Sequence, residues 1–226
     1  MIKNFKAVVL SLVLLSAFSY LPATAFTNNI TGKLIALDAG HGGTETGAVN
    51  TKYNVLEKDV NLAVVYALKS KLESNGALVV LSREGDETIS SRKDRVDTAV
   101  SKCQALAGRK CDILVSVHHN GNSDPTHDGA LVIYTQKSDV PLAKAMHDIL
   151  VPLTGIDEGY INGGYGMTVY QNLVSVLTEA YYITSDSEAE KYLAGTRVEE
   201  EAQAQLDGIN NYFGSKTGGG KGGGRK

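Results

Sequence analysis

The stretch "KLIALDAGHGG" at residues 33–43 joins a short apolar run to a turn that is rich in glycine. The run at 33–38 is typical of a buried β-strand, and the glycines after it allow the backbone to turn sharply. The stretch 57–76 then carries apolar residues at helical spacing and ends in a glycine that supplies a stop. These apolar residues are Val60, Val64, Leu68 and Leu72. A strand that leads into a helix is the first unit of an alternating pattern.

The rest of the chain repeats this alternation. Further strands are predicted at 77–83, 112–120, 129–135, 166–172 and 174–183. Further helices are predicted from about Ile89 to Leu106, at 140–153 and, as one long closing helix, at 187–213. Strands that alternate with helices predict an α/β fold, in which a mostly parallel sheet carries helices on both faces.

The two ends of the chain lie outside this pattern. Residues 1–25 contain two lysines, an apolar stretch and the small-x-small pattern "ATA", which together indicate a cleavable signal peptide. The apolar stretch is too short to span a membrane comfortably, so a retained anchor is the less favoured alternative. We therefore expect a periplasmic or secreted protein without stable membrane insertion. Residues 26–32 form a lead-in, 33–214 a single domain, and the glycine- and lysine-rich residues 215–226 a disordered tail.

The composition is that of an ordinary globular protein, with 42% hydrophobic and 21% charged residues. The formal net charge of −3 argues against a nucleic-acid partner. Cys103 and Cys111 are the only cysteines, and an isolated pair in an exported protein most often forms a disulfide. Their separation differs from the close spacing of structural zinc sites, and the sequence has no second pair. The sequence therefore predicts a Cys103–Cys111 disulfide.

Histidines follow two of the predicted strands. His41 comes after the first strand, and His118 and His119 close the strand at 112–120. Because chemistry gathers at the carboxyl ends of strands in such sheets, two imidazoles can meet there, and imidazole is a common metal ligand. Strand alternation sends His118 and His119 to opposite sides, so only one of them can face a metal. A phosphate-binding loop is excluded at "GHGGTETG", which lacks the lysine followed by serine or threonine.

Two glutamates complete a candidate zinc site. A catalytic zinc needs three protein ligands and an open position for water. Glu57, at the start of the first helix, could supply the third ligand. The alternative is that this acidic residue only stabilises the helix N-terminus through its interaction with the helix macrodipole. Glu179 lies in the strand at 174–183 and could act as a base, since a carboxylate among apolar residues is costly to bury unless it is paired or used. A lone strand-end histidine is more often only a hydrogen-bonded polar residue, so the hypothesis depends on the residues occurring together.

Other polar residues have plainer interpretations. Asp38 is a candidate for orienting a metal ligand without binding the metal itself, and a turn-capping role is an equal alternative. Arg83 and Arg95 are interpreted as structural ion-pair partners, with substrate clamps as the less favoured alternative. His127 is expected at the surface, and His147 is expected to be solvated on its helix.

Five motifs together resemble a known enzyme family. They are "LDAGHGG", a glutamate opening the first helix, "LSR", "ILVSVHHN" and "VLTEAYYITSDSE". In this order and spacing they resemble the zinc-dependent N-acetylmuramoyl-L-alanine amidases of the AmiC and CwlC kind. The resemblance covers residues 33–213 and makes 33–214 an amidase catalytic domain.

The resemblance implies a twisted, mostly parallel six-stranded sheet and a complete site. It implies Zn²⁺ held by His41, Glu57 and His118, with Glu179 as the catalytic residue, and it is the resemblance that selects His118 over His119. The implied reaction is hydrolysis of the amide between the lactyl group of MurNAc and L-alanine of the stem peptide, in peptidoglycan or muropeptides. We expect a monomer, and the short connection after 129–135 predicts no helix that folds over the site and blocks it.

The sequence departs from the family pattern at several positions. His119 stands where a small residue is common, and Ala180 and Tyr181 replace a usual small residue and glycine. Val100 stands where asparagine is usual. Two alternatives therefore remain: a zinc peptidase that acts on stem peptides, and a peptidoglycan-binding protein that kept the fold without catalysis.

Overall fold

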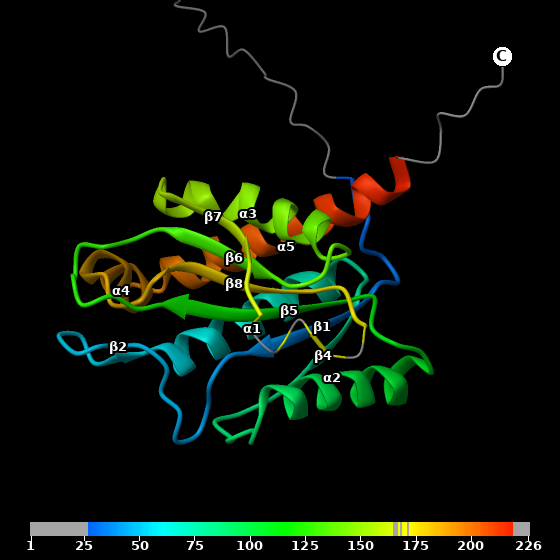
Figure 1. The fold of residues 1–226 in the computed structure, drawn as a ribbon, viewed down its shortest axis with the longest axis horizontal. Coiled ribbons are helices and arrows are strands. Elements are labelled where there is room, and N and C mark those ends of the chain that lie inside the picture. Colours follow the sequence, from blue (N-terminus) through cyan, green and yellow to red (C-terminus); the bar gives the residue numbers. More distant parts are fainter. Residues whose placement is uncertain (1–26, 165–166, 168, 171, 219–226) are drawn as a thin grey trace, which may run out of the picture.

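The computed structural model describes residues 27–164, 167, 169–170 and 172–218, and the predicted signal peptide at 1–25 lies outside them. Its main feature is a six-stranded sheet in the order β4-β1-β5-β8-β6-β7 (Figure 1). The strands are β1 (Leu34–Ala39), β4 (Leu78–Leu81), β5 (Ile113–Asn120), β6 (Ala130–Tyr134), β7 (Asp157–Asn162) and β8 (Ser175–Tyr182). The pairs are parallel except β6 with β8, which is antiparallel. The prediction of a mostly parallel α/β sheet is confirmed.

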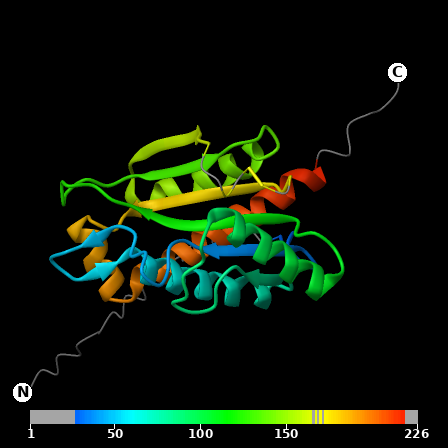
Figure 2. The ribbon, with the colours of Figure 1, turned by 60° about the horizontal axis from the view of Figure 1, so that its bottom comes forward.

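Helices cover both faces of the sheet (Figures 1 and 2). They are α1 (Glu57–Ser74), α2 (Arg92–Ala107), α3 (Val140–Thr154), α4 (Asp186–Leu193) and α5 (Thr196–Gly218). Side chains alternate along β1, so that Ile35 and Leu37 join the larger core under α1, α3 and α5, whereas Leu34 and Ala36 join the smaller core under α2. None of the helices in the described part of the chain combines enough length and apolar character to cross a membrane.

The outer part of the sheet differs from the prediction. Gly166, Thr168 and Gln171 lie outside the described residues, and the described residues of the predicted strand at 166–172 form turns and bends. The edge strand is instead β7, whose sequence "DEGYIN" is half-exposed and has no apolar run by which it could be found. A two-stranded hairpin, β2 (Val49–Asn50) with β3 (Val55–Leu56), also went unpredicted because each strand is two residues long.

The end of the chain also differs. The predicted closing helix is divided into α4 and α5 at Gly195, which has a φ of +79° and so interrupts the helical backbone. Helix α5 continues to Gly218, inside the stretch 215–226 that was predicted as a disordered tail. Two contacts with Tyr212 lie at this end of the helix: Ser215 Oγ donates to its carbonyl oxygen at 2.8 Å, and the Lys216 ammonium lies 4.7 Å from its ring centroid. Residues 219–226 lie outside the described residues.

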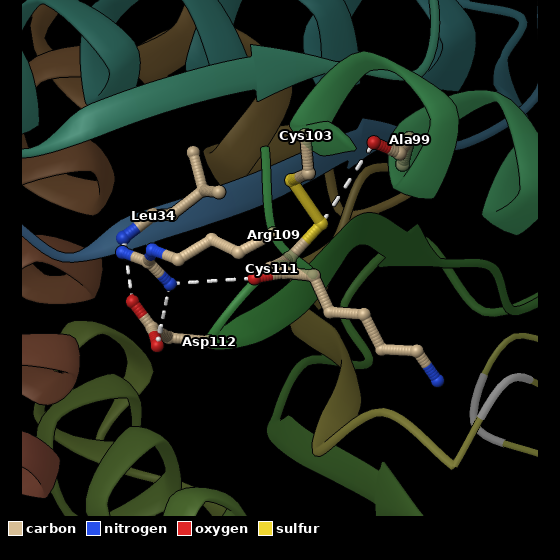
Figure 3. Close-up of a disulfide and its surroundings, with 7 residues drawn as sticks. Leu34, Ala99, Cys103, Arg109, Cys111 and Asp112 are labelled. Carbon is tan, nitrogen blue, oxygen red and sulfur yellow. Dashed lines mark hydrogen bonds and ion pairs between the residues drawn. A yellow bond between two sulfur atoms is a disulfide. The ribbon is translucent and has the colours of Figure 1, made fainter. Parts of the chain in front are cut away.

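The predicted disulfide between Cys103 and Cys111 is confirmed (Figure 3). Cys103 belongs to α2, and Cys111 lies two residues before β5. The neighbouring Asp112 accepts a hydrogen bond from Arg109 at 2.9 Å and another from the backbone N–H of Leu34 at 2.7 Å. The disulfide and Asp112 therefore tie α2 and the starts of β1 and β5 together at the end of the sheet opposite His118.

Replacing both cysteines with serine is expected to lower the free energy of unfolding by about 2 to 3 kcal/mol, because the closed loop restricts the unfolded chain. Urea unfolding of the parent and the double variant measures the difference. A reducing agent should destabilise the parent and leave the double variant unchanged. Two free thiols in the unfolded, unreduced parent would contradict the account.

Candidate active site

Three of the predicted site residues meet at the carboxyl ends of the strands. His41 follows β1, Glu57 is the first residue of α1, and His118 is near the end of β5. His41 Nε2 lies 3.2 Å and His118 Nδ1 lies 3.0 Å from Glu57 Oε1. The two imidazole rings meet edge to face with centroids 4.8 Å apart. Residues separated by up to 77 positions in the chain thus share one point in space.

The glycines around His41 provide the space that this cluster needs. A Cβ on Gly40 would lie 2.2 Å from the His118 ring, so a larger residue would displace that ring. Gly47 has a φ of +67°, and a Cβ there would lie 2.3 Å from Glu57 Oε2 and 2.7 Å from the His41 ring. The glycine-rich turn therefore lets the backbone pass directly against the imidazoles and the carboxylate.

Both oxygen atoms of Glu57 are held in place. Oε2 accepts a hydrogen bond from the backbone N–H of Ala48 at 2.8 Å, and Oε1 accepts one from Asn61 Nδ2 at 3.3 Å. Burial acts to raise the pKa of Glu57, but the hydrogen bonds from His118 and His41 outweigh it and hold the pKa well below its usual range. Glu57 is therefore an ionised, oriented carboxylate between two imidazoles.

This donor set fits a zinc ion. One atom each from His41, Glu57 and His118 can be chosen so that all three lie within 4.8 Å of one another. Two imidazole nitrogens and one carboxylate oxygen are the ligands of a catalytic zinc that keeps a fourth position open. The side chains of His41 and His118 are 29% and 16% exposed, so the cluster is accessible from the solvent side.

Glu179 lies beside this cluster on β8, where it is the register partner of His118 on β5. Its Oε2 atom is buried and has no hydrogen-bond partner among the described residues. Burial, reinforced by the negative charges of Glu57 and Glu158, raises the pKa of Glu179 well above its usual range. A carboxyl group whose pKa is raised by burial holds a proton more readily than an exposed one, which suits it to accept and return a proton.

The cluster opens into a groove of about 1090 Å³. His41, His118 and Glu179 line it together with cationic side chains from α2 and apolar side chains from the sheet and the following turn. These include Arg92, Lys93, Leu131, Ile133 and Tyr170. The groove is large enough for a substrate that extends on both sides of the cluster.

Asp38 is connected to the turn that carries His41 through Arg95. It is fully buried, accepts hydrogen bonds from Ser82 and from Ser116 at 2.6 Å, and pairs with Arg95 at 3.1 Å. Arg95 in turn donates to the carbonyl oxygen of His41 at 2.5 Å. Asp38 therefore acts on the turn through Arg95, which confirms Arg95 as an ion-pair partner.

Arg83 also fixes this turn, and it does so by hydrogen bonds to backbone carbonyl oxygens and not by the ion pair that was predicted. Its Nε donates to the carbonyl oxygen of Ala39 at 2.8 Å, and its Nη2 donates to those of Gly40 at 3.0 Å and Lys58 at 2.7 Å. The guanidinium thus joins the turn after β1 to the first turn of α1, which carries Glu57.

Asp38→Asn is expected to lower the free energy of unfolding at neutral pH by about 3 to 5 kcal/mol, because Arg95 would lose its buried partner. Burial acts to raise the pKa of Asp38, but Arg95, Ser116 and Ser82 lower it below 3.8 overall. The stabilisation is therefore present above about pH 4 and is lost as the pH falls through the lowered pKa of the folded state.

Urea unfolding between about pH 7 and pH 2 tests this expectation. The difference in the free energy of unfolding between the parent and Asp38→Asn should become smaller toward acid pH. Asp148→Asn is the control, since Asp148 forms an exposed pair with Lys144 and its loss should change stability by less than about 1 kcal/mol. A difference in the free energy of unfolding that stays constant over this pH range would contradict the account.

The remaining histidines have other partners. His119 points to the opposite side of β5 from His118 and is 2% exposed, as strand alternation predicted. His127 is partly exposed and lies 3.2 Å from Glu158. His147 is 8% exposed and its Nε2 lies 2.7 Å from Asp157 on β7, so the prediction of a solvated side chain is wrong. The unpredicted edge strand covers it.

Sequence reasoning missed Asn61, which touches both the turn and the cluster. Its Nδ2 donates to the carbonyl oxygen of Gly40 at 3.1 Å and to Glu57 Oε1 at 3.3 Å. Asn61 is fully buried one helical turn after Glu57. The available signal was a polar residue between Val60 and Val64 on the apolar side of the helix.

Fold and site together define a class of protein. A mostly parallel sheet that places two histidines and one glutamate in an open groove, with a second, ionised glutamate buried against the histidines, has the layout of an α/β metallohydrolase.

Comparisons with known proteins specify this class. The sequence model of the family described as N-acetylmuramoyl-L-alanine amidase matches residues 35–211. The amidase LytC of Bacillus subtilis is 31% identical over 196 residues, which are 84% of this chain and 38% of LytC. The uncharacterized protein YqiI of Bacillus subtilis is 30% identical over 201 residues, which are 87% of this chain and 93% of YqiI. The chain thus spans much less than two thirds of LytC and nearly all of YqiI.

Solved structures agree. The N-acetylmuramoyl-L-alanine amidase of Clostridium difficile 630 superposes with a TM-score of 0.73 at 28% identity, covering 82% of this chain and 99% of that one. The amidase AmiC2 of Nostoc punctiforme gives 0.71 at 25% identity, covering 81% and 99%. The chain belongs to the N-acetylmuramoyl-L-alanine amidase family of hydrolases.

Proposed function

We propose that the protein is a zinc-dependent peptidoglycan amidase that hydrolyses the amide between the lactyl group of MurNAc and L-alanine of the stem peptide. The observation that carries the proposal is the His41–Glu57–His118 cluster with Glu179 beside it, in a chain of the amidase family. The groove of about 1090 Å³ supports a substrate with a sugar on one side of the scissile bond and a peptide on the other.

His41, Glu57 and His118 would hold the zinc ion. When bound there, Zn²⁺ supplies Lewis acidity that polarises a carbonyl group and makes water more acidic. Glu179 accepts a proton from the attacking water and returns it to the nitrogen of the departing L-alanine. Its raised pKa favours holding that proton between the two transfers. Arg83 and Arg95 keep the turn that carries His41 in place.

Mass spectrometry of the products from a MurNAc-peptide tests this function. The proposal predicts two products, MurNAc with a free lactyl carboxylate and an intact stem peptide with a free L-alanine amine. A stem peptide that is shortened while MurNAc keeps its L-alanine would favour the zinc peptidase. Binding without any product would favour the non-catalytic protein.

The cellular setting is part of the proposal. The pattern at residues 1–25 supports export to the periplasm or the medium, where peptidoglycan is accessible. The connection between β6 and α3 is limited to residues 135–139. Because this connection is short, we expect no helix that blocks the site and no need for an activator. We also expect a monomer, and rates on isolated sacculi and on short muropeptides would show which substrate it prefers. A protein that is silent on both until an activator is added would contradict this expectation.

A further inference from the structure

A second polar layer lies behind the zinc cluster, on the other side of β5. Its centre is His119, whose side chain is fully buried together with that of Glu201 from α5. His119 Nε2 lies 2.8 Å from Glu201 Oε2, and His119 Nδ1 lies 2.7 Å from Asn61 Oδ1. Both ring nitrogens are therefore engaged, one with α5 and one with α1.

The orientation of Asn61 fixes the direction of these hydrogen bonds. Its amide nitrogen faces two acceptors, the carbonyl oxygen of Gly40 and Glu57 Oε1, so its Oδ1 atom faces His119 and accepts from Nδ1–H. On the other side, one proton satisfies both His119 Nε2 and Glu201 Oε2, and Glu201 Oε1 accepts from Gln205 Nε2 at 2.7 Å. A continuous chain of hydrogen bonds runs from α5 through His119 and Asn61 to Glu57.

Glu57 Oε1 accepts two hydrogen bonds from residues of this polar layer. One is Asn61 Nδ2, and the other is the backbone N–H of His119 at 3.2 Å. Burying such a polar pair contributes little to stability by itself, because removing the groups from water offsets their attraction. Residues that form hydrogen bonds with metal ligands, in contrast, orient those ligands, and their mutation typically lowers metal affinity 10- to 100-fold.

We propose that His119 and Glu201 are positioning residues of the metal site, which act through Asn61 to orient the Glu57 carboxylate. The proposal rests on the zinc site proposed above. It assigns a role to the histidine that replaces the small residue common at this position, and it extends the site to helix α5, 82 residues along the chain from His119.

Zinc affinity, measured by competition with a chromogenic chelator, tests the proposal. His119→Ala and Asn61→Ala are each expected to bind zinc about 10-fold more weakly than the parent. Because the two residues act in series, the double variant should bind no more weakly than Asn61→Ala alone. Glu201→Gln keeps an acceptor for His119 and should retain most of the affinity, whereas Glu201→Ala should lose about as much as His119→Ala.

Asn210→Ala is the matched control. Asn210 is a buried polar residue on the same helix, bonded to the backbone of Asn29 at 2.8 Å and Thr27 at 2.9 Å and not to the His119 layer. It should lower Tm and leave zinc affinity unchanged. Circular dichroism identifies the folded variants, and Glu201→Ala with Glu201→Gln carries the test if His119→Ala does not fold.

Two results would overturn the proposal. One is a folded His119→Ala or Glu201→Ala variant that binds zinc as tightly as the parent, which would leave this layer a purely structural role. The other is a double variant whose loss equals the product of the two single losses. A parent protein that binds no zinc would instead refute the metal site itself, so the two failures are distinguishable.

Discussion

Glu179→Ala is expected to retain close to one zinc ion per chain and to lose amide hydrolysis by ~10²- to 10⁴-fold, toward the upper end of that range. The reason is that one carboxyl group carries out both proton transfers, while its buried Oε2 atom has no partner in the ligand cluster. Zinc content by atomic emission, measured beside the rate of hydrolysis, tests both parts.

Glu179→Gln provides a control of similar shape. It keeps the volume of the side chain and removes the exchangeable carboxyl proton, so it should be as inactive as the alanine variant and retain zinc. An active Glu179→Gln variant would show that another group moves the proton. Loss of zinc from Glu179→Ala would overturn the division between ligands and base.

Glu57→Ala is expected to lose metal and activity together, because Glu57 supplies the only carboxylate of the cluster and both imidazoles point to its Oε1 atom. His118→Ala should behave in the same way. The loss should bring the rate close to the uncatalysed level, a larger effect than that of Glu179→Ala. Atomic emission and hydrolysis are again the measurements.

Two variants make this expectation specific. Glu73→Ala removes an exposed carboxylate that pairs with Lys69 near the other end of α1, and it should leave zinc content and rate unchanged. His119→Ala should still bind one zinc at saturating metal, since His119 points away from the cluster. Loss of zinc from His119→Ala under those conditions, with retention in His118→Ala, would show that the wrong histidine was chosen.

The parts of the fold that sequence predicts well are those buried on both sides. Strands β1, β5 and β8 each contain an apolar stretch, and α1 repeats its apolar residues at helical spacing, so burial is visible in the sequence itself. Strand β7 is an edge strand with polar, exposed residues, and its place in the sheet comes from pairing with β6. No local pattern contains that information.

The same distinction applies to the site. His41 follows β1, His118 lies near the end of β5, and Glu179 is the register partner of His118 in β8, so parallel topology brings the three side chains together and their types and order were informative. The choice between His118 and His119 needed the family resemblance. The contact between His119 and Glu201 could not be predicted, because it depends on how α5 packs behind β5.

Titration of the metal-free protein with zinc tests the central claim most directly. After the metal is removed with a chelator, release of stem peptide from a MurNAc-peptide should stop, and it should return in full as zinc approaches one equivalent per chain. The account predicts a linear recovery that ends at that point. Activity that survives complete removal of the metal, or a recovery that requires two equivalents, would contradict a single zinc site formed by His41, Glu57 and His118.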